Sequence, residues 1–61
     1  MIDLALLEKK LSLAVINRSL INGNIKMRVQ QQMPVIFVLE IKKRNDEYID
    51  LLIDQAQKGL E

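Results

Sequence analysis

The stretch that most constrains the fold is residues 35–41, Val-Ile-Phe-Val-Leu-Glu-Ile. Its first five residues are all apolar, so neither side of the backbone is left free for water. The run is short, Pro34 precedes it, and β-branched and aromatic residues dominate it, a pattern typical of a buried strand. We therefore predict a strand over residues 35–42.

A second strand is predicted just before it. Residues 25–30, Ile-Lys-Met-Arg-Val-Gln, alternate apolar and polar side chains, the pattern of a half-buried strand. Residues 31–34 connect the two, although they lack the Asn-Gly or Asp-Gly pair typical of a tight hairpin. The two segments together indicate a two-stranded antiparallel hairpin.

Helices are expected on both sides of this hairpin. Asp3 is a candidate N-cap and Gly23, in Asn22-Gly23-Asn24, a candidate C-terminal stop, which predicts a helix from residue 3 to about 22. Asn45 is a candidate N-cap for a second helix that ends at Lys58 and Gly59. The predicted fold is α+β, helix-strand-strand-helix, in a single small domain covering residues 1–61.

An all-α fold is the alternative. If Pro34 occupies the first turn of a helix, where proline is tolerated, residues 34–58 form one long helix. The chain would then be a helical hairpin without a sheet.

The chain has more apolar side chains than one small core requires. Hydrophobic residues make up 49% of its 61 residues, and without Cys or His it can form neither a disulfide nor an ordinary zinc site. The first helix carries two nearly opposite apolar stripes, and a two-stranded ribbon leaves its edges open. We therefore predict a homodimer or a higher homo-oligomer, without deciding which stripe faces outward. The predicted interface residues are Leu6, Leu13, Ile16, Leu20, Ile36 and Val38.

Most enzyme chemistry is excluded by composition. Without His or Cys the common nucleophile and base pairs are missing, and the only two glycines do not form a phosphate-binding loop. Asp46, Asp50 and Asp54 share one helical face, but acids near a helix N-terminus are explained by the helix dipole and by solvent. We predict no catalytic residue, no cofactor and no metal.

The predicted function is therefore contact with other proteins, as a small adaptor or regulator. No signal peptide or membrane span is indicated, so a cytoplasmic location is expected. The charge is uneven, with a balance of +4 over residues 24–44 and −4 from residue 45 onward. The alternative function is a dimeric nucleic-acid-binding regulator that uses the basic hairpin. Its candidate contact residues are Lys26, Arg28, Gln30, Lys42, Lys43 and Arg44.

Overall fold

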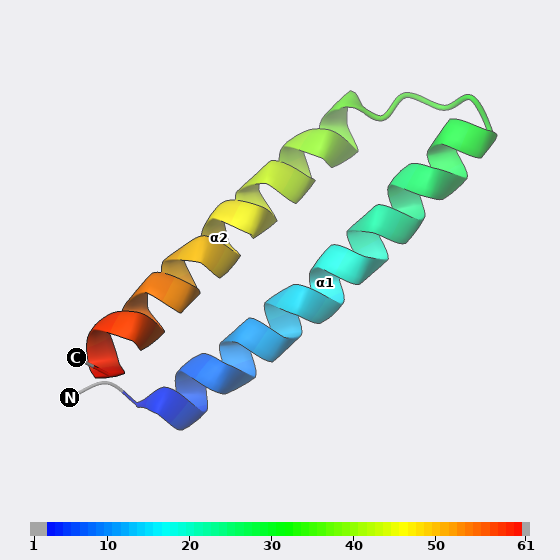
Figure 1. The fold of residues 1–61 in the computed structure, drawn as a ribbon. Helices are drawn as coiled ribbons and strands as arrows, with labels where there is room; N and C mark the ends of the chain where they lie inside the picture. Colours follow the sequence, from blue (N-terminus) through cyan, green and yellow to red (C-terminus); the bar gives the residue numbers. More distant parts are fainter. Residues whose placement is uncertain (1–2, 61) are drawn as a thin grey trace.

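The computed structural model describes residues 3–60, which form two long helices joined by a short connection (Figure 1). Helix α1 spans Leu4–Gln30 and helix α2 spans Ile36–Leu60. They run antiparallel along their whole length, so Leu4 and Leu60 lie at the end of the molecule opposite the connection. The Cα atoms fill a rod of 47 × 15 × 11 Å.

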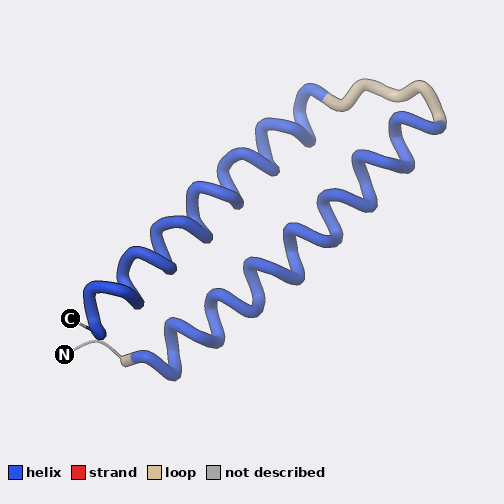
Figure 2. Tube along the Cα trace, viewed as in Figure 1, coloured by secondary structure: helices blue, strands red, loops and turns tan. Residues whose placement is uncertain are grey.

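The predicted α+β fold is wrong, and the helical hairpin that was its alternative is the observed fold. Figure 2 shows only helix and loop over residues 3–60. The first predicted strand, residues 25–30, forms the last turns of α1. The second, residues 35–42, contributes all but its first residue to the start of α2.

A repeat of alternating three- and four-residue steps explains why helices form. The residues that meet between the helices, called the seam below, follow this repeat in both halves of the chain, as in a coiled coil. With the exception of Asp46, every buried or half-buried residue in the part of the chain described belongs to it. Exposed Arg18 completes the spacing. The seam consists of Leu7, Leu11, Ala14, Arg18, Ile21, Ile25 and Arg28 from α1, and of Val35, Val38, Lys42, Asn45, Ile49, Leu52 and Ala56 from the second half of the chain.

The apolar run and the alternating segment both fit this repeat. In α2 only Val38 of the run points inward, whereas Ile36 and Phe37 are 83% and 77% exposed. In α1 the seam takes Ile25 and Arg28, three residues apart, and leaves Met27 and Val29 exposed. A short apolar run cannot by itself distinguish a strand from a helix, and here the longer repeat decides.

The core is small and concentrated toward the chain ends. Ala14, Ile49 and Leu52 form one buried cluster, with Leu7 and Leu11 packed against it. Nearer the connection, the seam buries little more than an isoleucine and a valine. The middle of the seam is polar.

Asn45 is the main polar contact across the seam. Its Nδ2 donates to the Ala14 carbonyl oxygen at 3.1 Å, and its Oδ1 accepts from Asn17 Nδ2 at 3.0 Å. The predicted N-cap role of Asn45 is therefore wrong, because it lies within α2 rather than before it. A polar side chain at such a position fixes the register of paired helices.

The two ends of α1 behave differently from each other. Asp3 is confirmed as the N-cap, since its Oδ1 accepts from the Leu6 backbone N at 3.1 Å. The predicted stop at Gly23 is wrong, because α1 continues for seven more residues. No atom outside its own helix lies within 4 Å of a Cβ placed on Gly23, so its missing side chain faces solvent.

Gln32 provides the stop in its place. It has a left-handed φ of 57°, a conformation usually taken by glycine. Its backbone N donates to the Val29 oxygen at 3.2 Å, and Met33 N donates to the Arg28 oxygen at 2.8 Å. This pair of hydrogen bonds is the Schellman motif, which satisfies the last carbonyls of α1 and turns the chain toward α2.

Replacing Gly23 with alanine should stabilise the protein. In an exposed helix interior, alanine is favoured over glycine by ~1 kcal/mol, which for a domain of this size raises the unfolding midpoint by ~4–8 °C. Thermal unfolding followed by circular dichroism measures it, with Gly59→Ala, in the last turn of α2, as the control with a smaller effect. A Gly23→Ala midpoint at or below that of the parent would contradict a continuous α1.

Leu52→Ala should destabilise the protein far more than Ile53→Ala. Leu52 is 4% exposed in the core cluster, whereas its neighbour Ile53 is 40% exposed. Truncation of a buried leucine costs ~2–5 kcal/mol, and that of an exposed residue typically less than ~1 kcal/mol. Urea unfolding of both variants measures the difference. Equal losses would mean that the seam is not the core.

Candidate interaction surface

The structure leaves most of the predicted interface residues on the surface. Leu6, Leu13, Ile16 and Leu20 of α1 are exposed, and Ile36 of α2 is the most exposed large apolar residue among those described. Val38 is different, because at 7% exposure it is covered within the same chain. It is therefore not available to a partner.

Four apolar residues of α1 form a line outside the seam. Leu6, Leu13, Leu20 and Met27 are spaced by seven residues, which is close to two helical turns, so they project from the same side of the helix. Each lies next to a seam position in sequence, and all four are exposed. The predicted residue Ile16 lies at the outer margin of this line.

A groove connects this line to α2. It has a volume of about 260 Å³ and is lined by Leu20, Ile21, Asn24, Arg28, Phe37, Val38 and Ile41. Leu20 and Phe37, the two most exposed of these apolar residues, therefore flank one depression from different helices. Seven-residue steps from Phe37 and Ile41 place Leu51 and Tyr48 on the same side of α2.

We call this side of the hairpin the broad apolar face. It extends over both helices and carries few charges. Its members are Leu6, Leu13, Leu20, Met27, Phe37, Ile41, Tyr48 and Leu51, all at least 40% exposed.

The polar end of the groove is held in place by hydrogen bonds. Arg28 Nε donates to Asn24 Oδ1 at 2.8 Å, and Arg28 Nη1 donates to the Pro34 carbonyl oxygen at 3.3 Å. The guanidinium therefore ties the end of α1 to the connection. Its charge is directed to the chain itself, so the groove is a mainly aliphatic recess with one polar wall.

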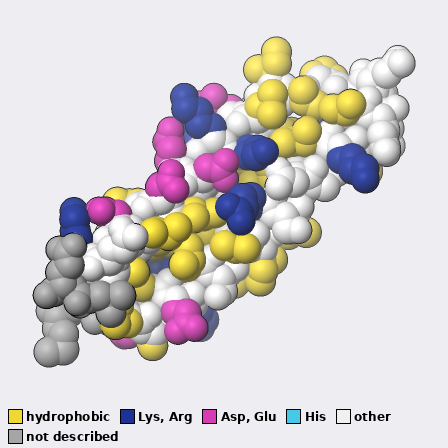
Figure 3. Space-filling view, in the orientation of Figure 1, with side chains coloured by type: hydrophobic (Ala, Val, Ile, Leu, Met, Phe, Trp, Pro, Cys, Tyr) yellow, Lys and Arg dark blue, Asp and Glu magenta, His cyan; other side chains and the backbone are white. Residues whose placement is uncertain are grey.

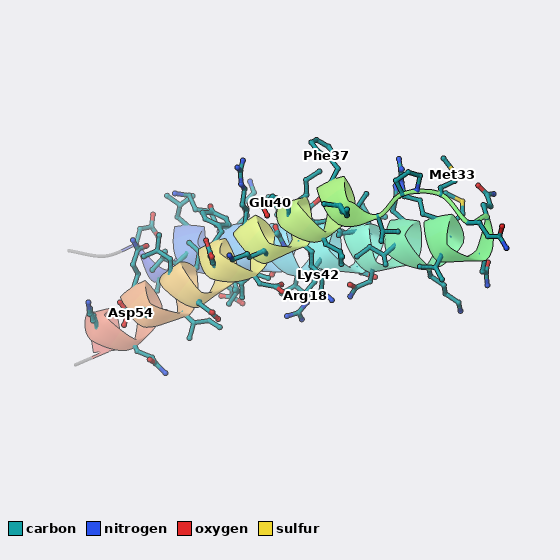
Figure 4. All side chains as sticks on the ribbon, turned by 90° about the horizontal axis from the view of Figure 1, so that it is seen from above. Arg18, Met33, Phe37, Glu40, Lys42 and Asp54 are labelled. Atoms are coloured by element: carbon teal, nitrogen blue, oxygen red, sulfur yellow. The ribbon has the colours of Figure 1, made fainter. Side chains whose placement is uncertain are left out.

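The opposite long side is more mixed. Figure 4 shows Phe37 on one long side of the hairpin and Arg18 with Lys42 on the other. The view in Figure 3, which looks onto the Arg18 and Lys42 side, shows hydrophobic side chains in two groups with Lys and Arg side chains between them. We call this side the mixed face. Charges interrupt its apolar surface, so it is less suited to a dry contact.

Arg44 and Lys58 lie at seven-residue steps from Phe37 and Leu51, so they project from the same side of α2. Each forms an ion pair with an acidic residue of the same helix. Arg44 Nε lies 3.8 Å from Glu40 Oε1, and Lys58 Nζ lies 3.0 Å from Asp54 Oδ2. All four side chains are more than half exposed, so these pairs add little stability. Arg44 lies midway between Phe37 and Leu51, within the α2 part of the broad apolar face, and Glu40 is its countercharge there.

The six predicted nucleic-acid contacts do not form a ribbon. Lys26, Arg28 and Gln30 lie on α1, and Lys42, Lys43 and Arg44 are consecutive in α2. Consecutive helical residues point about 100° apart, so the second group spreads around its helix. Arg28 is bonded to the chain and Arg44 to Glu40. The residues share the connection end of the rod but no single face.

The acidic residues of α2 do not gather into a binding site. Within residues 3–60, no group of three or more Asp or Glu side chains is placed to hold a metal ion. Asp46 lies beside the seam with its Oδ1 buried and without a hydrogen-bond partner. In the same part of the chain, neither helix combines the length and apolar content needed to cross a membrane.

Five residues of the broad apolar face were missed from the sequence. Met27, Phe37 and Ile41 were assigned to the two predicted strands and not to the interface. Tyr48 and Leu51 were not placed at an interface. The seven-residue spacing from Leu6 to Met27, continued without a break past Gly23, is the signal that would have identified α1's part.

Comparison of the chain with protein-family models, curated proteins and solved structures gives no match.

Proposed function

We propose that this chain is a non-enzymatic protein-interaction module that associates with itself through the broad apolar face and serves as an adaptor or regulator. The observation that carries the proposal is the concentration of eight large apolar side chains on one side of a two-helix rod. Large exposed apolar patches on small proteins mark sites of association.

The dimensions of this face suit a dimer. A side 47 Å long and 15 Å wide in its Cα extents offers roughly 700 Å², close to the ~800 Å² per partner of a standard interface. Two hairpins packed through it would form a four-helix bundle, in which each apolar line lies against a neighbouring helix. The mixed face would remain outside.

The energy of such a dimer is favourable on the same argument. Complete burial of a Leu, Ile, Phe or Met side chain contributes ~1.5–3 kcal/mol of favourable free energy. A side chain that is half exposed in the single hairpin would therefore contribute about half of this on association. Over eight side chains in each of two subunits this amounts to roughly 12–24 kcal/mol, against an association cost of ~4–15 kcal/mol. The small core supports the same conclusion, because a lone hairpin buries few side chains completely.

The chemistry of the surface supports binding rather than catalysis. The sequence has no His or Cys, and the groove beside Leu20 is lined mainly by aliphatic side chains. Such a recess suits an apolar side chain of a partner.

The proposal is tested by the oligomeric state of charge variants. Leu20→Asp places a carboxylate in the middle of the broad apolar face, where it would lose its water on association, and should raise the dimer dissociation constant by at least ~100-fold, given the usual cost of an unpaired buried charge. Light scattering coupled to size-exclusion chromatography, over a concentration series, measures the mass.

Val29→Asp is the matched control. Val29 is 60% exposed, comparable to Leu20 at 69%, but lies outside the broad apolar face. It should leave the dimer intact. A parent chain that stays monomeric at millimolar concentration, or equal effects of both variants, would contradict self-association through this face.

A further inference from the structure

We infer that the second copy lies antiparallel to the first, with the two connections at opposite ends of the bundle. This inference rests on the proposed function and adds the orientation of the partner and the helices that meet. The observation behind it is the distribution of charge along the rod, which is independent of the apolar side chains.

The two halves of the rod carry opposite charge. The connection half, residues 18–44, contains six Lys and Arg residues and one acid, Glu40, a net charge of +5. The other half, residues 3–17 together with residues 45–60, contains six acids and three lysines, a net charge of −3. Each hairpin is therefore positive at the connection end and negative at the end where both helices have their free termini.

Two symmetric arrangements bring the broad apolar faces together. A two-fold axis along the rod places both connections at the same end, so that +5 lies beside +5. A two-fold axis across the rod, in the plane of the contact, places each +5 half beside a −3 half. Most of these charges, Arg18 and Lys42 among them, lie away from the contact, so they act across the bundle rather than side by side. Like halves repel and opposite halves attract over this distance at low salt, so the second arrangement is preferred.

The axis also decides which helices pack together. With the connections at opposite ends, α1 lies against α1 of the second copy and α2 against α2. Full overlap places the middle of α1, near Asn17, on the axis, so Leu13 faces Leu20 of the other copy. Leu13 then lies at the level of the groove that Leu20 borders. With the connections at the same end, α1 would face α2, and Leu13 would lie near Leu51.

Disulfide trapping distinguishes the two arrangements. The chain has no Cys, so Leu13→Cys, Leu20→Cys and Leu51→Cys each introduce a single thiol. A disulfide requires Cα atoms within about 7 Å. Leu13→Cys mixed with Leu20→Cys should give a cross-linked dimer under mild oxidation. Either variant alone should give much less, because identical residues would lie seven positions, ~10 Å, apart along the helix. Mass spectrometry identifies the linked peptides.

The outcomes separate this inference from the proposed function. Linking of Leu13→Cys to Leu51→Cys in preference to Leu20→Cys overturns the antiparallel orientation and leaves self-association in place. A dimer in light scattering that gives no link in either mixture also overturns the orientation. Absence of a dimer overturns both.

Salt dependence provides a second test on the unmodified chain. Opposed charges weaken as salt screens them, and the screening length falls from roughly 20–30 Å at ~0.02 M to about 4–5 Å at ~0.5 M salt. The dimer dissociation constant should rise by several-fold over this range. The same-end arrangement predicts the reverse, because salt would relieve the repulsion between the +5 halves. Tighter association at high salt would therefore overturn the inference.

Discussion

The packing of α1 against α2 along the seam is the constraint on which the whole structure depends, because these two helices are the only elements that residues 3–60 form. Steps of three and four residues keep one stripe of each helix directed at the other over the length of the rod. Of the side chains that the structure describes, five are buried as a result, and three of them, Ala14, Ile49 and Leu52, belong to a single cluster. The apolar side chains that do not belong to the seam remain on the surface of the rod.

The seam also gives up apolar contact in return for register. Arg18, Lys42 and Asn45 occupy its middle, where aliphatic side chains would have packed more tightly. The hydrogen bonds from Asn45 to α1 are satisfied in one alignment of the helices only. A hairpin of this kind is well specified but has a thin core, and its remaining apolar side chains lie outside. The same sequence therefore accounts for an ordered hairpin and for an apolar surface that the hairpin itself does not cover.

Part of this fold could be predicted from the sequence, and the other predictions were wrong for identifiable physical reasons. Asp3 was found because a cap depends on a local side chain, and one of the two stripes of α1 corresponds to the seam. The end of α1 was misplaced because Gly23 faces solvent in the middle of the helix. The left-handed residue is Gln32, which is held by backbone hydrogen bonds that the residue type does not predict. The strands were predicted from six- and seven-residue patterns. Within those patterns, Ile25, Arg28 and Val38 belong to the seam, whose repeat can be recognised only over several helical turns.

A hairpin presents both ends of its chain together. Leu4 and Leu60 begin and end the two helices at the same end of a 47 Å rod, with the Gln32 turn at the far end. Any segment attached to either terminus would emerge beside the other and away from the turn. In the antiparallel pair proposed above, such attachments would point outward from opposite tips, and the bundle would hold them apart by about the length of one rod.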